Sequence, residues 1–110
     1  MENLIVKTGR VVHPVSEKDA DLATLQRLVG GFIEPLPWSA WLPGDVVALV
    51  NEDGALMPSP TVTWLPDLRR PIYGPVVFVR EVRTLSSATY AGLTDGQLQE
   101  IAERLVRFAQ

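Results

Sequence analysis

The sequence offers few side chains that could perform covalent or metal chemistry. It contains no cysteine and one histidine, His13, which excludes disulfides, thiolate metal sites and a cysteine nucleophile. A catalytic histidine needs an oriented partner and a nucleophile. Ser16 is close in sequence, but the Gly-x-Ser-x-Gly turn that presents a serine nucleophile is absent. We therefore expect a non-enzymatic protein without catalytic residues, cofactor or metal ion.

Two carboxylates and one amide are adjacent at Asn51, Glu52 and Asp53. These groups could hold a cation, but the Asp-x-Asp spacing of a calcium loop is absent. Asparagine and aspartate also favour tight turns, and Gly54 supplies a residue that tolerates positive φ. We therefore interpret the segment as a hairpin turn after a strand at 46–50, with residues 55–57 returning as its partner.

The three tryptophans, Trp38, Trp41 and Trp64, lie in two proline-rich segments, residues 35–45 and 58–71. A tryptophan on a loop can close one end of a small core, or it can anchor a binding partner. The sequence favours the core-closing role. An exposed Trp38 and Trp41 pair would instead form a partner-binding patch, which makes the tryptophans the best functional lead.

Arginines are the remaining candidates for binding. Arg69 and Arg70 lie beside Asp67 and Pro71, where they could clamp a phosphate or a carboxylate. Arginine is usually exposed, so a solvated loop is the favoured interpretation. The candidate partner- or ligand-binding residues are therefore Trp38, Trp41, Trp64, Arg69 and Arg70.

Hydrophobic periodicity indicates the elements that position these residues. Leu22, Leu25 and Val29 recur at helical spacing, and Gly30 is suited to a left-handed cap, which predicts a helix at 19–29. The segment 16–19 occupies the position of a capping box before it. Short β-branched or apolar runs predict further strands at 3–15, 32–36 and 76–82, and residues 84–92 are expected to form a loop.

A second helix is predicted at 94–108. Thr94 and Gln97 form a capping box, and an apolar stripe follows. The stripe can pack into the core of its own chain, or it can form a homodimer with a second copy. Its members are Leu98, Ile101, Leu105 and Phe108. The order of elements indicates an α+β fold, a small mainly antiparallel sheet of four to six strands with both helices on one face.

Composition bounds the class of protein. The chain has 110 residues, 46% of them hydrophobic, and a net charge of −3. This length supports a single domain over residues 1–110. An acidic balance disfavours nucleic acid as a partner. Because no apolar run is long enough for a signal peptide or a membrane span, we expect a cytoplasmic protein without a membrane partner.

Four segments together resemble a known family. They are Leu25–Glu34 with its Val-Gly-Gly, Val47–Gly54, Ile72–Val77 with its Gly-Pro-Val-Val, and Leu93–Asp95. The set resembles the small domain of unknown function numbered 3846, over roughly residues 20 to 100. The family usually has an Asn-Arg pair after the hairpin, where this chain has Pro58–Thr61 instead. The resemblance implies a bacteriophage or mobile-element setting, hence a host cytoplasm, and it implies no chemistry.

The sequence leaves two functions open. The first is a non-enzymatic accessory protein that acts by binding a host protein, supported by the missing catalytic groups, the acidic charge and the loop tryptophans. The alternative is a protein that binds or sequesters a small ligand, such as a nucleotide, at an oligomer interface containing Arg69, Arg70 and the tryptophans.

Overall fold

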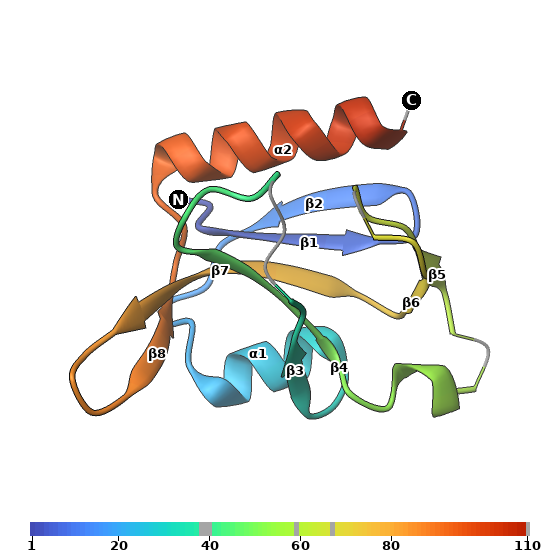
Figure 1. The fold of residues 1–110 in the computed structure, drawn as a ribbon, viewed down its shortest axis with the longest axis horizontal. Helices are drawn as coiled ribbons and strands as arrows, with labels where there is room; N and C mark the ends of the chain where they lie inside the picture. The colour runs from blue at the N-terminus through green and yellow to red at the C-terminus, as the bar shows by residue number, and fades with distance from the viewer. Residues whose placement is uncertain (38–40, 59, 67, 110) are drawn as a thin grey trace.

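The computed structural model describes residues 1–37, 41–58, 60–66 and 68–109 (Figure 1). The α+β fold class and the mainly antiparallel sheet predicted from the sequence are confirmed. In chain order the elements are β1 (Leu4–Thr8), β2 (Val11–Val15), α1 (Leu22–Val29), β3 (Ile33–Pro35), β4 (Val46–Asn51), the 3-10 helix η1 (Gly54–Leu56), β5 (Val62–Thr63), β6 (Ile72–Tyr73), β7 (Val76–Arg83), β8 (Ala88–Ala91) and α2 (Asp95–Ala109).

The six-stranded sheet is organised around β7. Its main order is β2-β1-β7-β4-β3, and every pairing is antiparallel. Residues 76–78 of β7 pair with β1, and residues 80–83 pair with β8. Since β4 occupies the opposite edge of β7, β1 and β8 lie in line along the same edge. Strands β5 and β6 form a separate two-stranded ribbon beyond the sheet.

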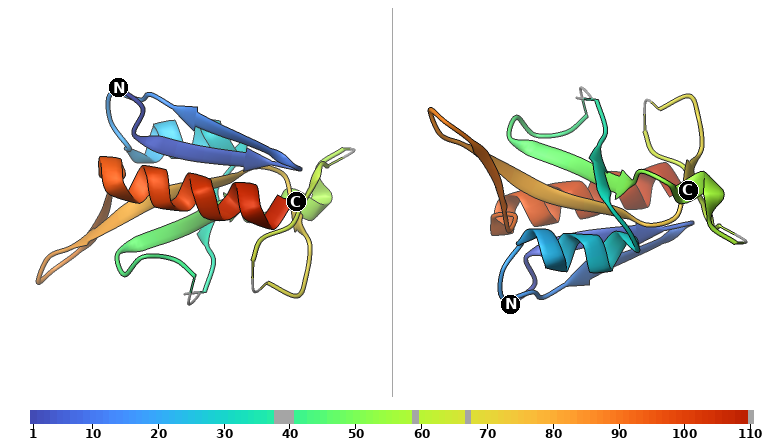
Figure 2. Two further views of the ribbon diagram at one scale, coloured as in Figure 1. Left: turned by 90° about the horizontal axis from the view of Figure 1, so that it is seen from above. Right: turned by 90° about the horizontal axis from the view of Figure 1, so that it is seen from below.

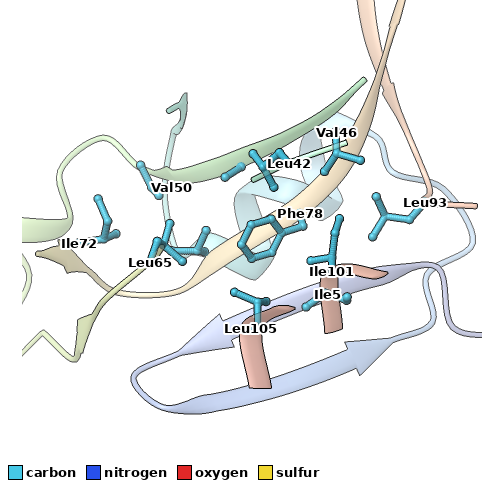
Figure 3. Close-up of a cluster of buried hydrophobic side chains, with 12 residues drawn as sticks. Ile5, Leu42, Val46, Val50, Leu65, Ile72, Phe78, Leu93, Ile101 and Leu105 are labelled. Atoms are coloured by element: carbon cyan, nitrogen blue, oxygen red, sulfur yellow. The ribbon is translucent and has the colours of Figure 1, made fainter. Parts of the chain in front are cut away.

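The two helices cover opposite faces of the sheet, which corrects the prediction that both lie on one face (Figure 2). Along β7, Phe78 packs in a core with Ile101 of α2, whereas Val77 packs in a core with Leu25 of α1. Figure 3 shows the α2-side core around Phe78. Strands β1, β4 and β7 are apolar at successive positions, so both faces of the sheet need a cover.

The helix ends agree with the sequence in part. The Gln97 side chain accepts a hydrogen bond from the Thr94 amide at 3.0 Å, and Thr94 Oγ1 accepts one from the Gln97 amide at 3.2 Å, so the predicted capping box is confirmed. Gly30 adopts the predicted left-handed cap with φ 82°. The first helix, however, begins at Leu22, because Asp21 is its N-cap and accepts from the Thr24 amide at 2.9 Å.

Two predicted elements differ in the structure. Residues 55–57 do not return as a strand, because η1 forms directly after the turn. Its first residue, Gly54, packs against the Tyr73 carbonyl of β6. Residues 84–92 are not all loop, since β8 pairs with β7. The first difference depends on Tyr73, which is distant in the sequence. The second is a local hairpin whose small and polar residues resemble a loop.

Gly54 gives a sharp test of this packing. A Cβ on Gly54 would lie 2.2 Å from the Tyr73 carbonyl oxygen, whereas a Cβ on Gly96 of α2 would meet nothing within 4 Å. We expect Gly54→Ala to lower the free energy of unfolding by about 1–3 kcal/mol through overpacking. The matched Gly96→Ala should leave it unchanged or raise it by up to about 1 kcal/mol. Urea denaturation measures both, and equal effects would contradict the packing described.

Candidate functional site

The β5–β6 ribbon carries an exposed aromatic surface. Exposure alternates along β5 and the residue after it, with Val62 41% and Trp64 49% exposed while Thr63 is buried. Val62 pairs directly with the half-buried Tyr73 of β6. Paired residues of an antiparallel ribbon direct their side chains to the same face. We call Val62, Trp64 and Tyr73 the ribbon face.

A buried network fixes the backbone of this ribbon to the β1–β2 turn. Lys7 Nζ donates hydrogen bonds to the carbonyl oxygens of Gly9 at 2.6 Å and Trp64 at 3.0 Å. The Thr63 hydroxyl accepts from the Gly9 amide at 2.8 Å and donates to the Gly74 carbonyl at 2.9 Å. Buried hydrogen bonds therefore hold the ribbon backbone in place, while the ribbon face is exposed to solvent.

Lys7 is the unusual member of this network. Only 2% of the residue is exposed, and burial lowers the pKa of its ammonium group, because a low-dielectric environment disfavours the charged form. The acceptors of both its hydrogen bonds are neutral carbonyl oxygens. A neutral amine keeps two N–H donors, so both bonds can persist after the proton is lost.

Trp41 has the core-closing role that the sequence favours. Its ring packs edge-to-face on Phe78, with centroids 5.7 Å apart and planes at 71°. Its carbonyl accepts a hydrogen bond from Arg104, which also pairs with Glu100 at 2.6 Å. Trp41 therefore belongs to the α2-side core and not to a solvent-exposed pair. Trp38 lies outside the described residues.

The predicted arginines lie at the surface of the described part of the chain. Arg69 and Arg70 are both exposed. Arg70 lines a hollow of about 160 Å³ together with Glu34, Glu52 and Tyr73. The two carboxylates beside Arg70 weaken its attraction for an anion.

The histidine and the carboxylate turn have ordinary surroundings. His13 is exposed on β2 and pairs with Val6. Asp53 and Glu52 are exposed, and the Asp53 amide donates to Asn51 Oδ1 at 2.8 Å, as expected for a tight turn. Asn51 itself is buried, and its amide group donates to the Val29 carbonyl at 3.4 Å. Its side chain therefore joins the end of α1 to the turn.

The described part of the apolar stripe of α2 packs within its own chain. Ile101 and Leu105 are fully buried, and Leu98 packs against the same core. The Phe108 side chain lies outside the described part of the chain. Ile101 and Leu105 are therefore not available to a second copy. A homodimer through this stripe would have to form without them.

Sequence reasoning missed Lys7 and Thr63 as parts of the site. Lys7 ends the apolar run that begins at Leu4, so a charged residue occupies a buried strand position. Thr63 alternates with Val62 and Trp64, which is a period-2 signal inside a segment that its prolines marked as a loop. Those two features of the pattern were the available signals.

Comparison with known proteins gives a family and no activity. The sequence matches the family described as Domain of unknown function (DUF3846) over residues 1–106. The chain belongs to this family. The match extends the resemblance noted in the sequence to nearly the whole chain. No curated protein and no solved structure shows significant similarity to this DUF3846 chain.

Among residues 1–37, 41–58, 60–66 and 68–109, no helix of this DUF3846 protein is long and apolar enough to cross a membrane. Across the same described ranges, no three His, Asp or Glu side chains gather where they could hold a metal ion.

The lowered pKa of Lys7 predicts a pH effect on stability. Between that pKa and 10.5, the ordinary value for lysine, the unfolded chain binds more protons at this site than the folded chain. The free energy of unfolding therefore rises with pH in this window. Urea titrations of the wild type and Lys7→Met measure both free energies of unfolding. As pH approaches 10.5, the free energy of unfolding of the wild type should rise relative to that of Lys7→Met.

The matched control is Lys18→Met, because Lys18 is exposed. The difference in free energy of unfolding between a variant and the wild type removes the pH dependence of groups that both proteins contain. Tyr90, whose pKa is raised by burial and by Glu81, is one such group. The same pH dependence in the two variants would contradict the assignment to Lys7.

Proposed function

We propose that this DUF3846 protein is a non-enzymatic interaction module that binds another protein through its ribbon face. The observation that carries the proposal is the state of Trp64. About half of this residue is exposed, while its backbone carbonyl is held by the buried Lys7. A bacteriophage or mobile-element setting, which the family resemblance implies, would make the partner a host protein.

A fixed backbone supports this role through the entropy of binding. Association costs free energy for each side chain and loop that must become ordered. The hydrogen bonds from Lys7 and Thr63 have already ordered the ribbon before a partner arrives. Tryptophan and tyrosine are among the residues that contribute most to interface hot spots, and Trp64 and Tyr73 provide one of each.

The surroundings of the ribbon face also favour a protein partner. Val62 adds exposed apolar surface beside Trp64, and Val11, at the start of β2, is a further exposed valine near the β1–β2 turn. Exposed apolar residues that gather beside one another mark interaction sites more often than isolated ones do. The ribbon is short, with two residues in each strand, so its face presents a small apolar and aromatic surface to a partner.

Trp64→Ala tests this function. We expect the variant to fold like the wild type and to bind its partner at least about tenfold more weakly, the scale of a hot-spot residue. Partners captured from host extract by the wild type are purified, and their affinity for each variant is measured by titration calorimetry. Circular dichroism checks the fold of each variant.

The control is Leu85→Ala. Leu85 is fully exposed in the β7–β8 turn, so the change removes an exposed apolar side chain outside the ribbon face. It should keep wild-type affinity. Equal affinity of wild type and Trp64→Ala for every captured protein would contradict the proposal.

The alternative, a nucleotide or other small ligand bound by Arg69 and Arg70 at an oligomer interface, has weaker support. The hollow beside Arg70 measures about 160 Å³, whereas ligand pockets usually measure about 300–1,000 Å³. Glu34 and Glu52 also line it and would repel a phosphate.

We therefore expect millimolar ATP or GTP to leave the thermal midpoint unchanged, because a ligand raises the midpoint only if it binds the folded state. Differential scanning fluorimetry measures this. A rise that is lost in Arg70→Ala and kept in Arg107→Ala, an exposed arginine of α2, would instead favour the ligand-binding function.

A further inference from the structure

Strand β8 is an edge strand without the usual protection against pairing. The other outer strands of the sheet are blunted, β2 by Pro14 and β3 by its three-residue length with Glu34 and Pro35. Proline and charge on an edge discourage the addition of another strand. The sequence of β8 is Ala-Thr-Tyr-Ala, with no proline and no charge.

The register defines which backbone groups of β8 point outward. The Thr84 amide donates to the Ser87 carbonyl at 2.8 Å, and the pairing continues from there with Val82 opposite Thr89. Hydrogen-bonded pairs alternate in an antiparallel ladder. Thr89 and Ala91 therefore bond to β7, while the N–H and C=O groups of Ala88 and Tyr90 face away from it.

A groove of about 830 Å³ runs along this outward edge. One wall is Ala88–Gly92, and the other wall is the segment Lys18–Leu22 that leads into α1. Because β8 lies in line with β1, the groove occupies the row that β2 fills farther along the sheet. Figure 1 shows β8 at the end of the sheet away from the β5–β6 ribbon.

Asn3 explains why the chain leaves this row open. Its side chain donates to the Glu17 carbonyl at 2.8 Å and accepts from the Glu17 amide at 2.9 Å. These bonds turn the chain away just after β2, and the Asn3 side chain also lines the groove. The row therefore ends at a fixed point, next to an edge with unpaired backbone groups.

The walls of the groove indicate its occupant. Lys18–Leu22 forms the far wall, so the occupant must lie between two walls, which suits a single extended strand better than the edge of another sheet. Asp19 and Asp21 face one Lys18, which leaves a net negative charge, and Leu22 is 57% exposed. The apolar and acidic lining fits a peptide whose side chains alternate between apolar and basic.

We propose that β8 and the segment Lys18–Leu22 form a strand-addition site, which binds an extended peptide carrying a basic side chain opposite Asp19. The peptide pairs with the outward backbone groups of Ala88 and Tyr90, and four of its residues span about 13 Å, the length of a strand such as β8. This site is separate from the ribbon face, so it goes beyond the function proposed above.

The test uses three synthetic peptides with capped ends. The first is TVKVT, the second is TVEVT, and the third is TVKVT with N-methylated amides, which cannot donate to β8. Titration calorimetry and amide shifts of the 15N-labelled protein report binding. We expect TVKVT to bind saturably with shifts at Ala88 and Tyr90, and the other two peptides to bind at least about tenfold more weakly.

Protein variants locate the site. Ala88→Pro removes one outward N–H without touching the bonds to β7 and should weaken TVKVT binding at least about tenfold. Asp19→Lys should reverse the preference, so that TVEVT binds more tightly than TVKVT. Leu85→Ala, in the exposed turn beside β8, should match the wild type. If Ala88→Pro does not fold, Asp19→Lys and the N-methylated peptide still decide the question, since neither alters β8.

Three results would overturn the proposal. The first is no saturable binding of TVKVT or TVEVT to the wild type at millimolar concentration. The second is equal binding of the N-methylated and unmethylated peptides. The third is a dimer, detected by light scattering, that Ala88→Pro dissociates, because a second copy would then occupy the edge. Loss of partner binding in Trp64→Ala, in contrast, bears only on the ribbon face.

Discussion

Four consecutive side chains of β7, Val76–Val79, are fully buried, and this burial determines the architecture of the molecule. Successive side chains of a strand point to opposite faces, so the sheet must be covered twice. Helix α1 covers Val77 and Val79, and α2 covers Val76 and Phe78. A short chain therefore uses both its helices on the core, and neither retains its full apolar face for another role.

The same constraint places the functional candidates at the two ends of β7. The core takes the first half of the strand, where β1 and β4 flank it. The chain enters β7 from the β5–β6 ribbon, which Lys7 holds through the Trp64 carbonyl. At the other end, the last four residues of β7 pair with β8. Both ends of β7 thus adjoin small β elements whose outer surfaces are not buried in the core.

Local signals in the sequence predicted what local physics determines. The cap at Thr94 and Gln97 and the left-handed Gly30 depend on neighbours within a few residues, and both are confirmed. The opposite placement of the helices was implied by the unbroken apolar run of 46–50, but the direction in which each helix crosses the sheet depends on distant pairing. Gly54 likewise packs against Tyr73, which is far along the chain, whereas β8 pairs with the neighbouring β7 and was missed because its residues resemble a loop.

The candidate site was the least predictable part, because its parts violate the rules on which prediction relies. A lysine in a buried strand position and an edge strand without charge or proline both cost stability or solubility relative to apolar and protected alternatives. Such departures are expected where a sequence serves something besides folding. Lys7 holds the carbonyl of an exposed tryptophan, and β8 borders the groove beside Asp19. Both departures lie next to a surface proposed here for binding, and a binding role would account for their cost to stability.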